Sequence, residues 1–201
     1  MIITISREFA SGGREVGKRL ADALGLDYYD KEIVTEIAKS TSLDPEYVTR
    51  VLSKGGRNYA ISFAHTLPLT PVITDMVTDV LVAQQKVIKA IGEKGNCVIV
   101  GRSADVILKE MRPVKIFVYA DEQSKIKRCR ERERDGEDLT DKKLLKKFKE
   151  IDKGREKLHD LLSSGEWGEK EGYDIMLNTS GAEIKNLIPA LSELVKQYNK
   201  Q

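Results

Sequence analysis

Ser11-Gly12-Gly13 form a glycine loop between a β-branched apolar stretch at residues 2–6 and a helical pattern that begins directly after the loop. Such a loop presents backbone N–H groups and the positive end of a helix dipole, and this arrangement binds phosphate. A plain strand-to-helix turn also uses glycine, because glycine adopts positive φ at little cost. The loop alone leaves both interpretations open. If it binds phosphate, we expect residues 10–15 to hold an anion even without nucleotide.

Polar residues stand at the ends of three further apolar stretches. Asp30, Arg102 and Asp121 each follow such a stretch, Arg102 after one intervening glycine. In open parallel sheets, ligands bind at the carboxyl ends of the strands. Polar residues at four strand ends, the glycine loop included, favour a ligand site over packing alone.

The elements that must position these residues alternate between strand and helix. Gly25 closes the first helix, and Asp44-Pro45 predicts a short helix to about residue 54, with Asp44 as N-cap. A long amphipathic helix is predicted over 73–91 and a closing helix over 184–195. Strands are predicted at 2–6, 26–29, 97–100, 114–119 and 174–177. This alternation predicts an α/β fold with a parallel sheet.

The stretch from 58 to 71 has the least regular pattern in the chain. Glycine and proline are dense across 55–71, and helical patterns flank the stretch on both sides. We interpret it as a flexible excursion and expect it to be among the most mobile parts of the protein.

Composition excludes several classes of protein. The 201 residues are 40% hydrophobic and 33% charged with a net charge of +2, which excludes disordered, fibrous and disulfide-stapled classes. No apolar run approaches the ~18 residues of a membrane helix, so no membrane partner is expected. The two cysteines have no metal-ligand or CxxC spacing, which predicts no metal-binding residues and a reducing cytoplasm. The N-terminus lacks a basic segment and is interpreted as a strand, not a signal peptide.

Positive charge is concentrated in one segment. Residues 125–157 hold 14 Lys and Arg against 9 Asp and Glu, while the rest of the chain is net negative. The segment has no interleaved aromatic residue other than Phe148, which argues against nucleic acid as the partner. Its run of alternating sign, 128–134, is ordinarily a solvated helix face.

The order of these features resembles the cytidylate kinase-like branch of the P-loop nucleoside monophosphate kinases. The likeness runs from about residue 2 to 180 and is more specific than any single motif. The matching stretches are 3–15, 28–31, 98–105, 115–121, Asp152-Lys153-Gly154-Arg155, Trp167-Gly168 and 173–180.

The resemblance implies a P-loop NTPase fold, three-layer α/β/α with a five-stranded parallel sheet in a single domain, 1–201. It implies a helical acceptor-binding insertion at 31–80 and a basic lid at about 125–147. It also implies a phosphotransferase that uses ATP and Mg²⁺ and acts on a small-molecule nucleotide.

Residue by residue, the resemblance places donor phosphates on the loop Ala10, Ser11, Gly12, Gly13, Arg14 and Glu15. Acceptor-binding residues would be Asp30, Arg102, Asp152 and Arg155. The arginines that could close on the phosphates are Arg128, Arg130, Arg132 and Arg134.

The loop departs from the standard pattern, in which Gly-Lys-[Ser/Thr] supplies a lysine to the β- and γ-phosphates and a hydroxyl to Mg²⁺. Gly13 stands at the lysine position and Glu15 at the hydroxyl position. Arg14 is the nearest cation that could reach back to the phosphates, and a carboxylate such as Glu15 can bind Mg²⁺. The family's Tyr-Arg pair falls at Thr35-Glu36, so the resemblance does not identify the acceptor base.

Several of these residues also have a purely structural interpretation. Asp152 and Arg155, three apart on a helix, could be an exposed ion pair, and Arg102 could pair with Asp30 or Asp105. His159 is interpreted as a surface or capping residue and Trp167 as packing.

The leading hypothesis is an ATP-dependent phosphotransferase acting on a nucleoside monophosphate, cytidylate-like, or a related small phosphate acceptor. The alternative, motivated by the missing lysine, is a nucleotide- or phosphate-binding sensor with the kinase fold and little transfer activity.

Overall fold

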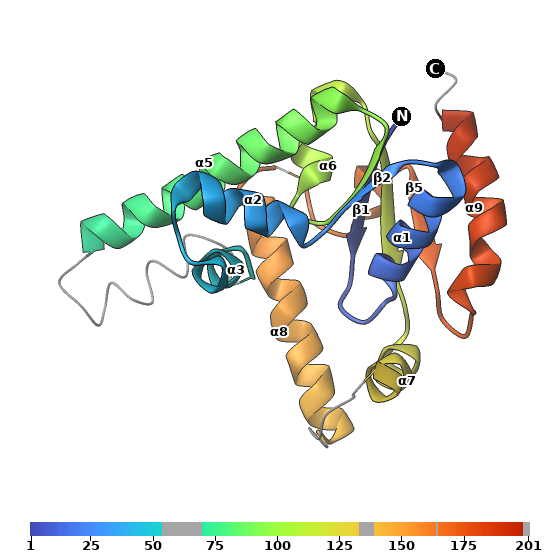
Figure 1. Cartoon of the computed structure of the whole chain (residues 1–201). Helices are drawn as coiled ribbons and strands as arrows, with labels where there is room; N and C mark the ends of the chain where they lie inside the picture. Colours follow the sequence, from blue (N-terminus) through green and yellow to red (C-terminus); the bar gives the residue numbers. More distant parts are fainter. Residues whose placement is uncertain (54–69, 133–138, 164, 199–201) are drawn as a thin grey trace.

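A five-stranded sheet, parallel at every pair of neighbouring strands, forms the centre of the molecule (Figure 1). The computed structural model describes residues 1–53, 70–132, 139–163 and 165–198. The strands are β1 (Ile2–Arg7), β2 (Asp27–Tyr29), β3 (Cys97–Val100), β4 (Val114–Tyr119) and β5 (Ile175–Asn178), in the order β2-β3-β1-β4-β5. Because β1 is the central strand, the loop that follows it lies at the middle of the carboxyl edge.

The described helices connect these strands and extend beyond the sheet on one side (Figure 1). They are α1 (Gly13–Leu24), α2 (Glu32–Thr41), α3 (Pro45–Ser53), α5 (Thr70–Lys94), α6 (Ala104–Ile107), α7 (Glu122–Arg132), α8 (Asp141–Asp160) and α9 (Ile184–Tyr198), with short 3₁₀ turns at Lys109–Met111 and Lys170–Gly172.

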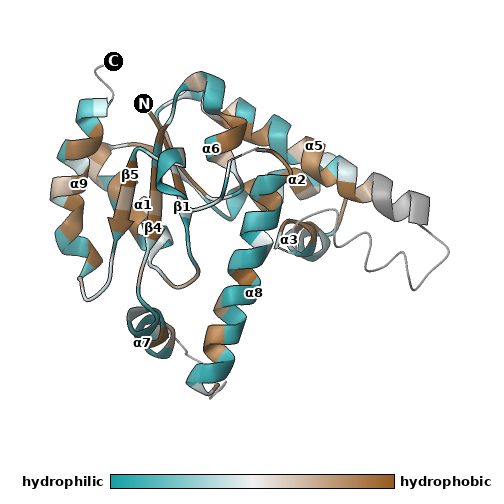
Figure 2. Ribbon diagram, turned by 180° about the vertical axis from the view of Figure 1, so that it is seen from behind, coloured by the Kyte–Doolittle hydropathy of each residue, from teal (hydrophilic) through white to brown (hydrophobic). Residues whose placement is uncertain are grey.

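Alternation along the strands divides the buried core between the two faces of the sheet. On β3, Val98 and Val100 pack into a cluster with α1 and α9, whereas Cys97 and Ile99 pack into a second cluster with α2, α3 and α5. Successive side chains of a strand point to opposite faces, so a strand buried on both faces is apolar throughout. Figure 2 shows this as hydrophobic strands between helices with hydrophilic outer faces. The predicted three-layer α/β/α arrangement with a five-stranded parallel sheet is confirmed.

The start of α3 agrees with its prediction, and the start of α5 does not. Asp44 caps α3 as predicted, because its Oδ1 accepts the backbone N–H groups of Glu46 and Tyr47 at 2.8 and 3.1 Å. The irregular stretch predicted to end at Pro71 ends earlier, since α5 already begins at Thr70. A proline in the first helical turn has no N–H that the helix needs, so Pro71 does not prevent the helix from starting there. The rest of that stretch, and the end of the predicted α3 at residue 54, lie outside the described residues.

The predicted insertion and lid fall on helices at the open side of the sheet. The segment 31–80 comprises α2, α3 and the start of α5, and α3 packs against α8. The segment 125–147 comprises most of α7 and the first turns of α8, which also contact each other. Within the described ranges, no helix is long and apolar enough to cross a membrane.

Candidate functional site

The loop after β1 is tightly folded and leaves donors free at the start of α1. Ala10 and Gly12 have φ of 57° and 86°, the left-handed region that glycine adopts most easily. The Ser11 hydroxyl donates to the Glu8 carbonyl at 2.8 Å, so the loop is closed by its own side chain. Gly12 is the N-cap and offers no side-chain cap to the first N–H groups of α1. These amides are available to an anion.

Tertiary contacts hold this loop from both sides. On one side, the Thr179 hydroxyl at the end of β5 donates to the Ser11 carbonyl at 2.7 Å. On the other, Asp152 Oδ1 on α8 accepts the Phe9 N–H at 2.7 Å. Arg155 is bonded to the same carboxylate at 2.9 Å and donates to the Arg7 carbonyl at 2.9 Å. The loop is therefore positioned before any ligand arrives.

The bond between Thr179 and the loop leads to a stability prediction. Thr179 is fully buried, so Thr179→Val keeps the shape but leaves the Ser11 carbonyl without its hydroxyl donor. We expect the free energy of unfolding, measured by urea denaturation, to fall by about 1–3 kcal/mol. Thr35→Val on the exposed face of α2 is the matched control and should change it by less than ~0.5 kcal/mol. Equal effects of the two substitutions would show that this bond does not hold the loop.

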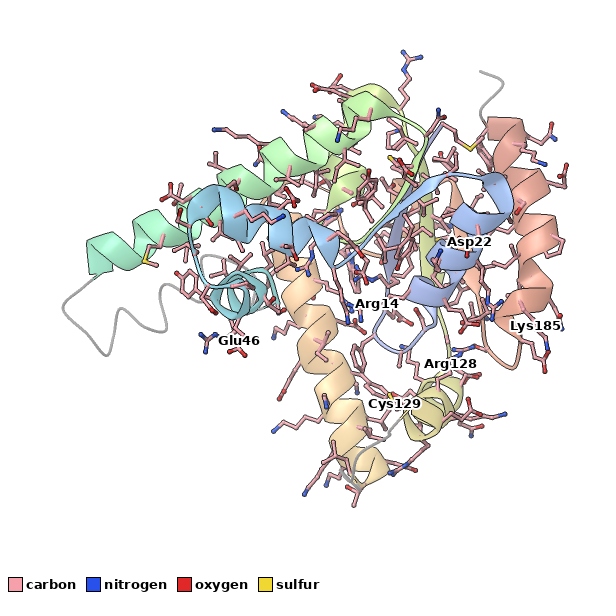
Figure 3. All side chains as sticks on the ribbon, viewed as in Figure 1. Arg14, Asp22, Glu46, Arg128, Cys129 and Lys185 are labelled. Carbon is pink, nitrogen blue, oxygen red and sulfur yellow. The ribbon has the colours of Figure 1, made fainter. Side chains whose placement is uncertain are left out.

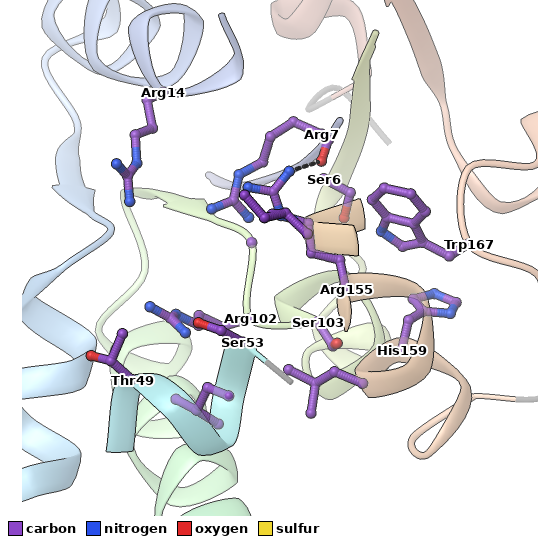
Figure 4. Close-up of a pocket in the computed structure, with 14 residues that line it drawn as sticks. Ser6, Arg7, Arg14, Thr49, Ser53, Arg102, Ser103, Arg155, His159 and Trp167 are labelled. Atoms are coloured by element: carbon purple, nitrogen blue, oxygen red, sulfur yellow. Dashed lines mark hydrogen bonds between the residues drawn. The ribbon is translucent and has the colours of Figure 1, made fainter. Parts of the chain in front are cut away.

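Four arginines converge on the space beside the loop (Figure 4). Arg7 comes from the end of β1, Arg14 from the first turn of α1, Arg102 from the turn after β3 and Arg155 from α8. Asp30, at the end of β2, is the buried acid among them: its Oδ2 lies 2.7 Å from Arg14 Nε and its Oδ1 3.9 Å from Arg7 Nη2. Asp30 and Asp152, the partner of Arg155, supply two carboxylates against four guanidinium groups, so this space keeps a net positive charge and favours anions.

Burial disfavours the charged form of Arg102 and Arg155 and lowers their pKa. Desolvation lowers the pKa of Arg102 to about 10, with Asp30 opposing the effect and Arg14 and Arg155 adding to it. Desolvation likewise lowers the pKa of Arg155. At neutral pH both groups remain protonated. A bound phosphate would replace the hydration that these guanidinium groups have lost.

Arg102 is placed by an unusual backbone turn. Its φ is 63°, and the fully buried Gln84 of α5 donates to its carbonyl at 3.1 Å. Its Nε is buried without a hydrogen-bond partner among the described residues. The alternative that Arg102 pairs with Asp105 is not realised among the described residues, where Asp105 Oδ2 lies 3.7 Å from Nε2 of His159.

Two pockets meet at the arginines. The first, called the α3 pocket, has a volume of about 170 Å³ and is lined by Ser6, Arg7, Arg14, Thr49, Leu52, Ser53, Gly101, Arg102, Ser103, Ile151, Arg155, Leu158, His159 and Trp167. The second, called the α7 pocket, has a volume of about 310 Å³ and is lined by residues 7–10, Gly12, Gly13, Arg14, Arg128, Cys129, Leu144, Lys147 and Arg155. Arg7, Arg14 and Arg155 line both. Two ligands could therefore face each other across shared cations.

The predicted lid arginines lie in different places. Arg128 lines the α7 pocket and donates to the carbonyls of Thr179 and Ala10, so it is bonded to the phosphate loop itself. Figure 3 shows Arg14 and Arg128 near the turn that precedes α1. Arg130 instead donates to Leu139 and Asp141 and joins α7 to the start of α8, outside both pockets. Arg134 and the side chain of Arg132 lie outside the described residues.

The carboxylates near the loop do not assemble a metal site. Glu15 accepts Arg19 at 2.9 Å and lines neither pocket, so its position does not fit a Mg²⁺ ligand for phosphates on the loop. Glu8 lines the α7 pocket, but its Oε2 is bound by Lys125 at 2.7 Å and by the Ala120 N–H. No group of three or more acidic, His or Cys side chains suited to a metal occurs in the part of the chain that the structure describes. The residues present therefore do not fit Mg²⁺ held by the protein alone.

Two sequence interpretations change in the structure, those of Asp121 and His159, and that of Trp167 is extended. Asp121 caps α7 by accepting the Ser124 N–H at 2.7 Å and lines neither pocket. His159, interpreted as a surface or capping residue, is only 5% exposed and lines the α3 pocket, because it is on the face of α8 that packs against the turn after β3. Trp167 packs edge-on against Phe117, with ring centroids 5.1 Å apart, as predicted, and also lines the α3 pocket.

From the sequence, Arg14 is the first candidate for the missing cation, and Arg7 is only a fallback beside the lid arginines. It is the last residue of β1, where alternation suggests an ordinary strand position. The available signal was its neighbourhood: an arginine directly before a glycine loop that lacks the expected lysine. The Asp152–Arg155 pair is also more than an exposed ion pair, since both side chains are mostly buried and bond to the backbone of the loop.

Solved structures with the same fold include kinases. The chain is similar to an uncharacterized protein from Eubacterium ventriosum, with 26% identity, 98% of each chain covered and a TM-score of 0.70. It is also similar in fold to shikimate kinase from Acinetobacter baumannii, in complex with shikimate, with 15% identity, 100% and 95% coverage and a TM-score of 0.56. Shikimate kinase from Bacteroides thetaiotaomicron gives 13% identity, 98% coverage of each chain and a TM-score of 0.59.

No protein of curated function matches the chain. The model of the cytidylate kinase-like family matches residues 2–181, nearly the whole sequence. The match covers the glycine loop, all five strands and the four arginines that line the α3 pocket. The chain therefore belongs to the cytidylate kinase-like family and has the fold of the P-loop kinases.

Proposed function

We propose that this protein is a phosphotransferase that moves the γ-phosphoryl group of ATP to a nucleoside monophosphate, cytidylate-like, or to a related small phosphate acceptor. The observation that carries the proposal is the pair of pockets that share Arg7, Arg14 and Arg155. Phosphoryl transfer asks a protein mainly to align two ligands and to neutralise charge between them. Cations common to both pockets are suited to that task.

The α7 pocket is the proposed donor site. It contains the loop residues Ala10, Gly12 and Gly13, where free amides and the N-terminus of α1 favour the phosphates of ATP. Arg128 and Lys147 line its other wall and would add positive charge from α7 and α8. In this proposal these helices form the lid, which excludes water and limits idle hydrolysis.

The α3 pocket is the proposed acceptor site. Arg102 and Arg155 line it together with Thr49 and Ser53 of α3, so the segment 31–80 contributes to its wall. Asp30 bonds Arg14 and thereby sets the direction of that guanidinium. Four arginines suit an acceptor that carries a phosphate dianion, and a neutral acceptor would leave them unbalanced.

The proposed step needs no catalytic base. A phosphate oxygen of the acceptor, already unprotonated near neutral pH, forms the new bond to the γ-phosphorus, and the bond from that phosphorus to the bridging oxygen breaks. The guanidinium groups keep their protons and stabilise the charge on the phosphoryl oxygens. ATP chemistry ordinarily also uses Mg²⁺, which here would arrive with the nucleotide, since the described carboxylates build no site for it.

A coupled assay of ADP release tests the proposal directly. The protein would be given Mg²⁺-ATP with a panel of nucleoside monophosphates, and turnover that depends on one acceptor is the expected result. Tight nucleotide binding by calorimetry without turnover on any acceptor would instead select the phosphate-binding sensor. Strong retention of DNA or RNA that weakens steeply with salt would select a nucleic-acid binder and contradict both.

A further inference from the structure

We propose that Arg7 takes the place of the missing loop lysine and binds the phosphoryl group that passes from the donor pocket to the acceptor pocket. This inference rests on the proposed function and names the residue at its centre. It concerns a side chain at the end of β1 that the strand pattern does not mark as functional.

Residues 7 and 13 face the same small space. A side chain at Gly13, the lysine position of a standard loop, would begin with a Cβ only 2.6 Å from Cβ of Arg7 and 2.8 Å from its Cγ. Atoms at such separations overlap, and every residue except glycine has a Cβ, so a side chain at 13 and a side chain at 7 exclude each other unless the backbone shifts. Glycine at 13 therefore leaves the space in which the side chain of Arg7 lies, and a lysine at 13 would need glycine at 7.

The guanidinium of Arg7 lies against the turn after β3. A Cβ at Gly101 would overlap Nη1 of Arg7, so the side chain runs from the glycine loop to the turn after β3, with its stem against one glycine and its head against another. Along this path Arg7 lines both the α7 pocket and the α3 pocket. Figure 4 shows its guanidinium directed into the space that Arg14 and Arg102 also enter. It thus lies at the junction of the two ligand sites.

The guanidinium of Arg7 has no close acceptor among the described residues. The side chain of Arg7 is 11% exposed, and its nearest acid is Asp30, 3.9 Å away, beyond hydrogen-bond distance. Within the part of the chain that the structure describes, its guanidinium makes no hydrogen bond. Arg14 and Arg155, by contrast, are bonded to Asp30 and Asp152. A buried arginine whose donors have no protein acceptor is prepared for a ligand that supplies one.

The electrostatics agree with this geometry. Burial lowers the pKa of Arg7 well below its ordinary value, and Arg155 lowers it further. Asp30 opposes this, and Arg102 and Arg14 add smaller lowering effects. The protein therefore holds a desolvated cation next to three others. A phosphoryl group between the pockets would relieve that repulsion, and its oxygens match the planar fork of the guanidinium.

The transfer step then balances as follows. ATP carrying four negative charges and an acceptor phosphate carrying two give ADP and a nucleoside diphosphate carrying three each. The acceptor oxygen supplies the electron pair of the new P–O bond, and the bridging oxygen of ADP keeps the pair of the bond that breaks. Arg7 remains protonated and hydrogen-bonds oxygens of the moving group.

Substitutions at position 7 test the inference by turnover and by ATP binding. Arg7→Ala is expected to lower turnover by about 10²–10³-fold and to weaken ATP binding, measured calorimetrically, by about 10- to 100-fold. Arg7→Lys, which retains a cation, should recover part of both losses, and the distant exposed Lys94→Ala should match the wild type. Native circular dichroism of each variant shows that it is folded. Folded Arg7→Ala with wild-type turnover and wild-type ATP affinity would overturn the inference.

A double variant that exchanges the residues at positions 7 and 13 tests whether the two side chains compete for the same space. Gly13→Lys alone should impair the protein because it collides with Arg7, and Arg7→Gly alone should lose the cation. The double variant Arg7→Gly/Gly13→Lys should recover at least about tenfold of the turnover that Arg7→Gly loses. A double variant whose losses are simply the product of the two single losses contradicts the exchange.

The readouts separate this inference from the proposed function. If the wild type transfers phosphate to no acceptor, the proposed function fails. The ATP affinity of Arg7→Ala still tests whether Arg7 binds phosphate. A tenfold or greater loss of ATP affinity in Arg7→Ala then supports Arg7 as the phosphate ligand, and an unchanged affinity rejects it.

Discussion

Arg14→Ala is expected to lower turnover by about 10²–10³-fold, the cost of removing one charge-assisted contact made mainly in the transition state. Arg14 begins the helix whose N-terminus faces the glycine loop, and it lines both pockets. Its side chain is 53% exposed, and its Nε is held by Asp30 at 2.7 Å, so the remaining guanidinium donors are fixed in direction. We propose that Arg14 binds the phosphates from the solvent side, while Arg7 lies beneath them.

The matched control for Arg14 is a cation one helical turn further along α1. Lys18 is exposed and pairs with Asp22 on the helix surface, away from both pockets. Lys18→Ala should therefore leave turnover unchanged in the same ADP-release assay. If Arg14→Ala and Lys18→Ala both turn over at the wild-type rate, Arg14 has no part in transfer, and the positive charge comes from the remaining arginines of the pockets.

Arg155→Ala is expected to damage both stability and activity. It removes the donor to the Arg7 carbonyl and leaves the mostly buried Asp152 without its cation. The free energy of unfolding should fall by about 1.5–3 kcal/mol, the value of a hydrogen bond to a charged group, and turnover should fall at least about tenfold because Arg155 lines both pockets. Lys153→Ala, exposed on the same helix, is the control and should change neither quantity appreciably.

The stability loss of Arg155→Ala should depend on pH in a defined direction. Desolvation already raises the pKa of Asp152 in the folded wild type, and Arg155 opposes that rise. Removing Arg155 raises the folded-state pKa of Asp152 further above its unfolded value. A carboxyl group whose folded-state pKa is raised does not destabilise the folded protein while it is protonated. It lowers the free energy of unfolding as the pH rises through its folded-state pKa.

The difference in unfolding free energy between wild type and Arg155→Ala should thus be smaller near pH 4 than near pH 7.5. Urea denaturation at the two pH values measures it. A deficit that is equal at both, or larger at the lower pH, would show that the pair does not stabilise the fold through the charge of Asp152.

The sequence alone determined the architecture, because the signals for it are local. Alternating apolar strands and amphipathic helices predict a parallel α/β sheet, and glycines and capping residues such as Asp44 mark where elements begin and end. The edge that carries the site also follows from local order. Residues that directly follow parallel strands, such as Asp30 and Arg102, must lie at the same edge of the sheet.

The arrangement of the cations was decided by the tertiary structure. Periodicity does not show that Arg7 turns from the end of β1 into the junction of two pockets, because that path depends on two glycines, Gly13 and Gly101, which are 88 residues apart in the chain. Nor does it show that Asp152 and Arg155 bond to the backbone of a loop more than 140 residues earlier. A local pattern records which face of an element is apolar. Which distant side chains share a buried space depends on how the elements pack, and here that packing placed Arg7 where it lines both pockets.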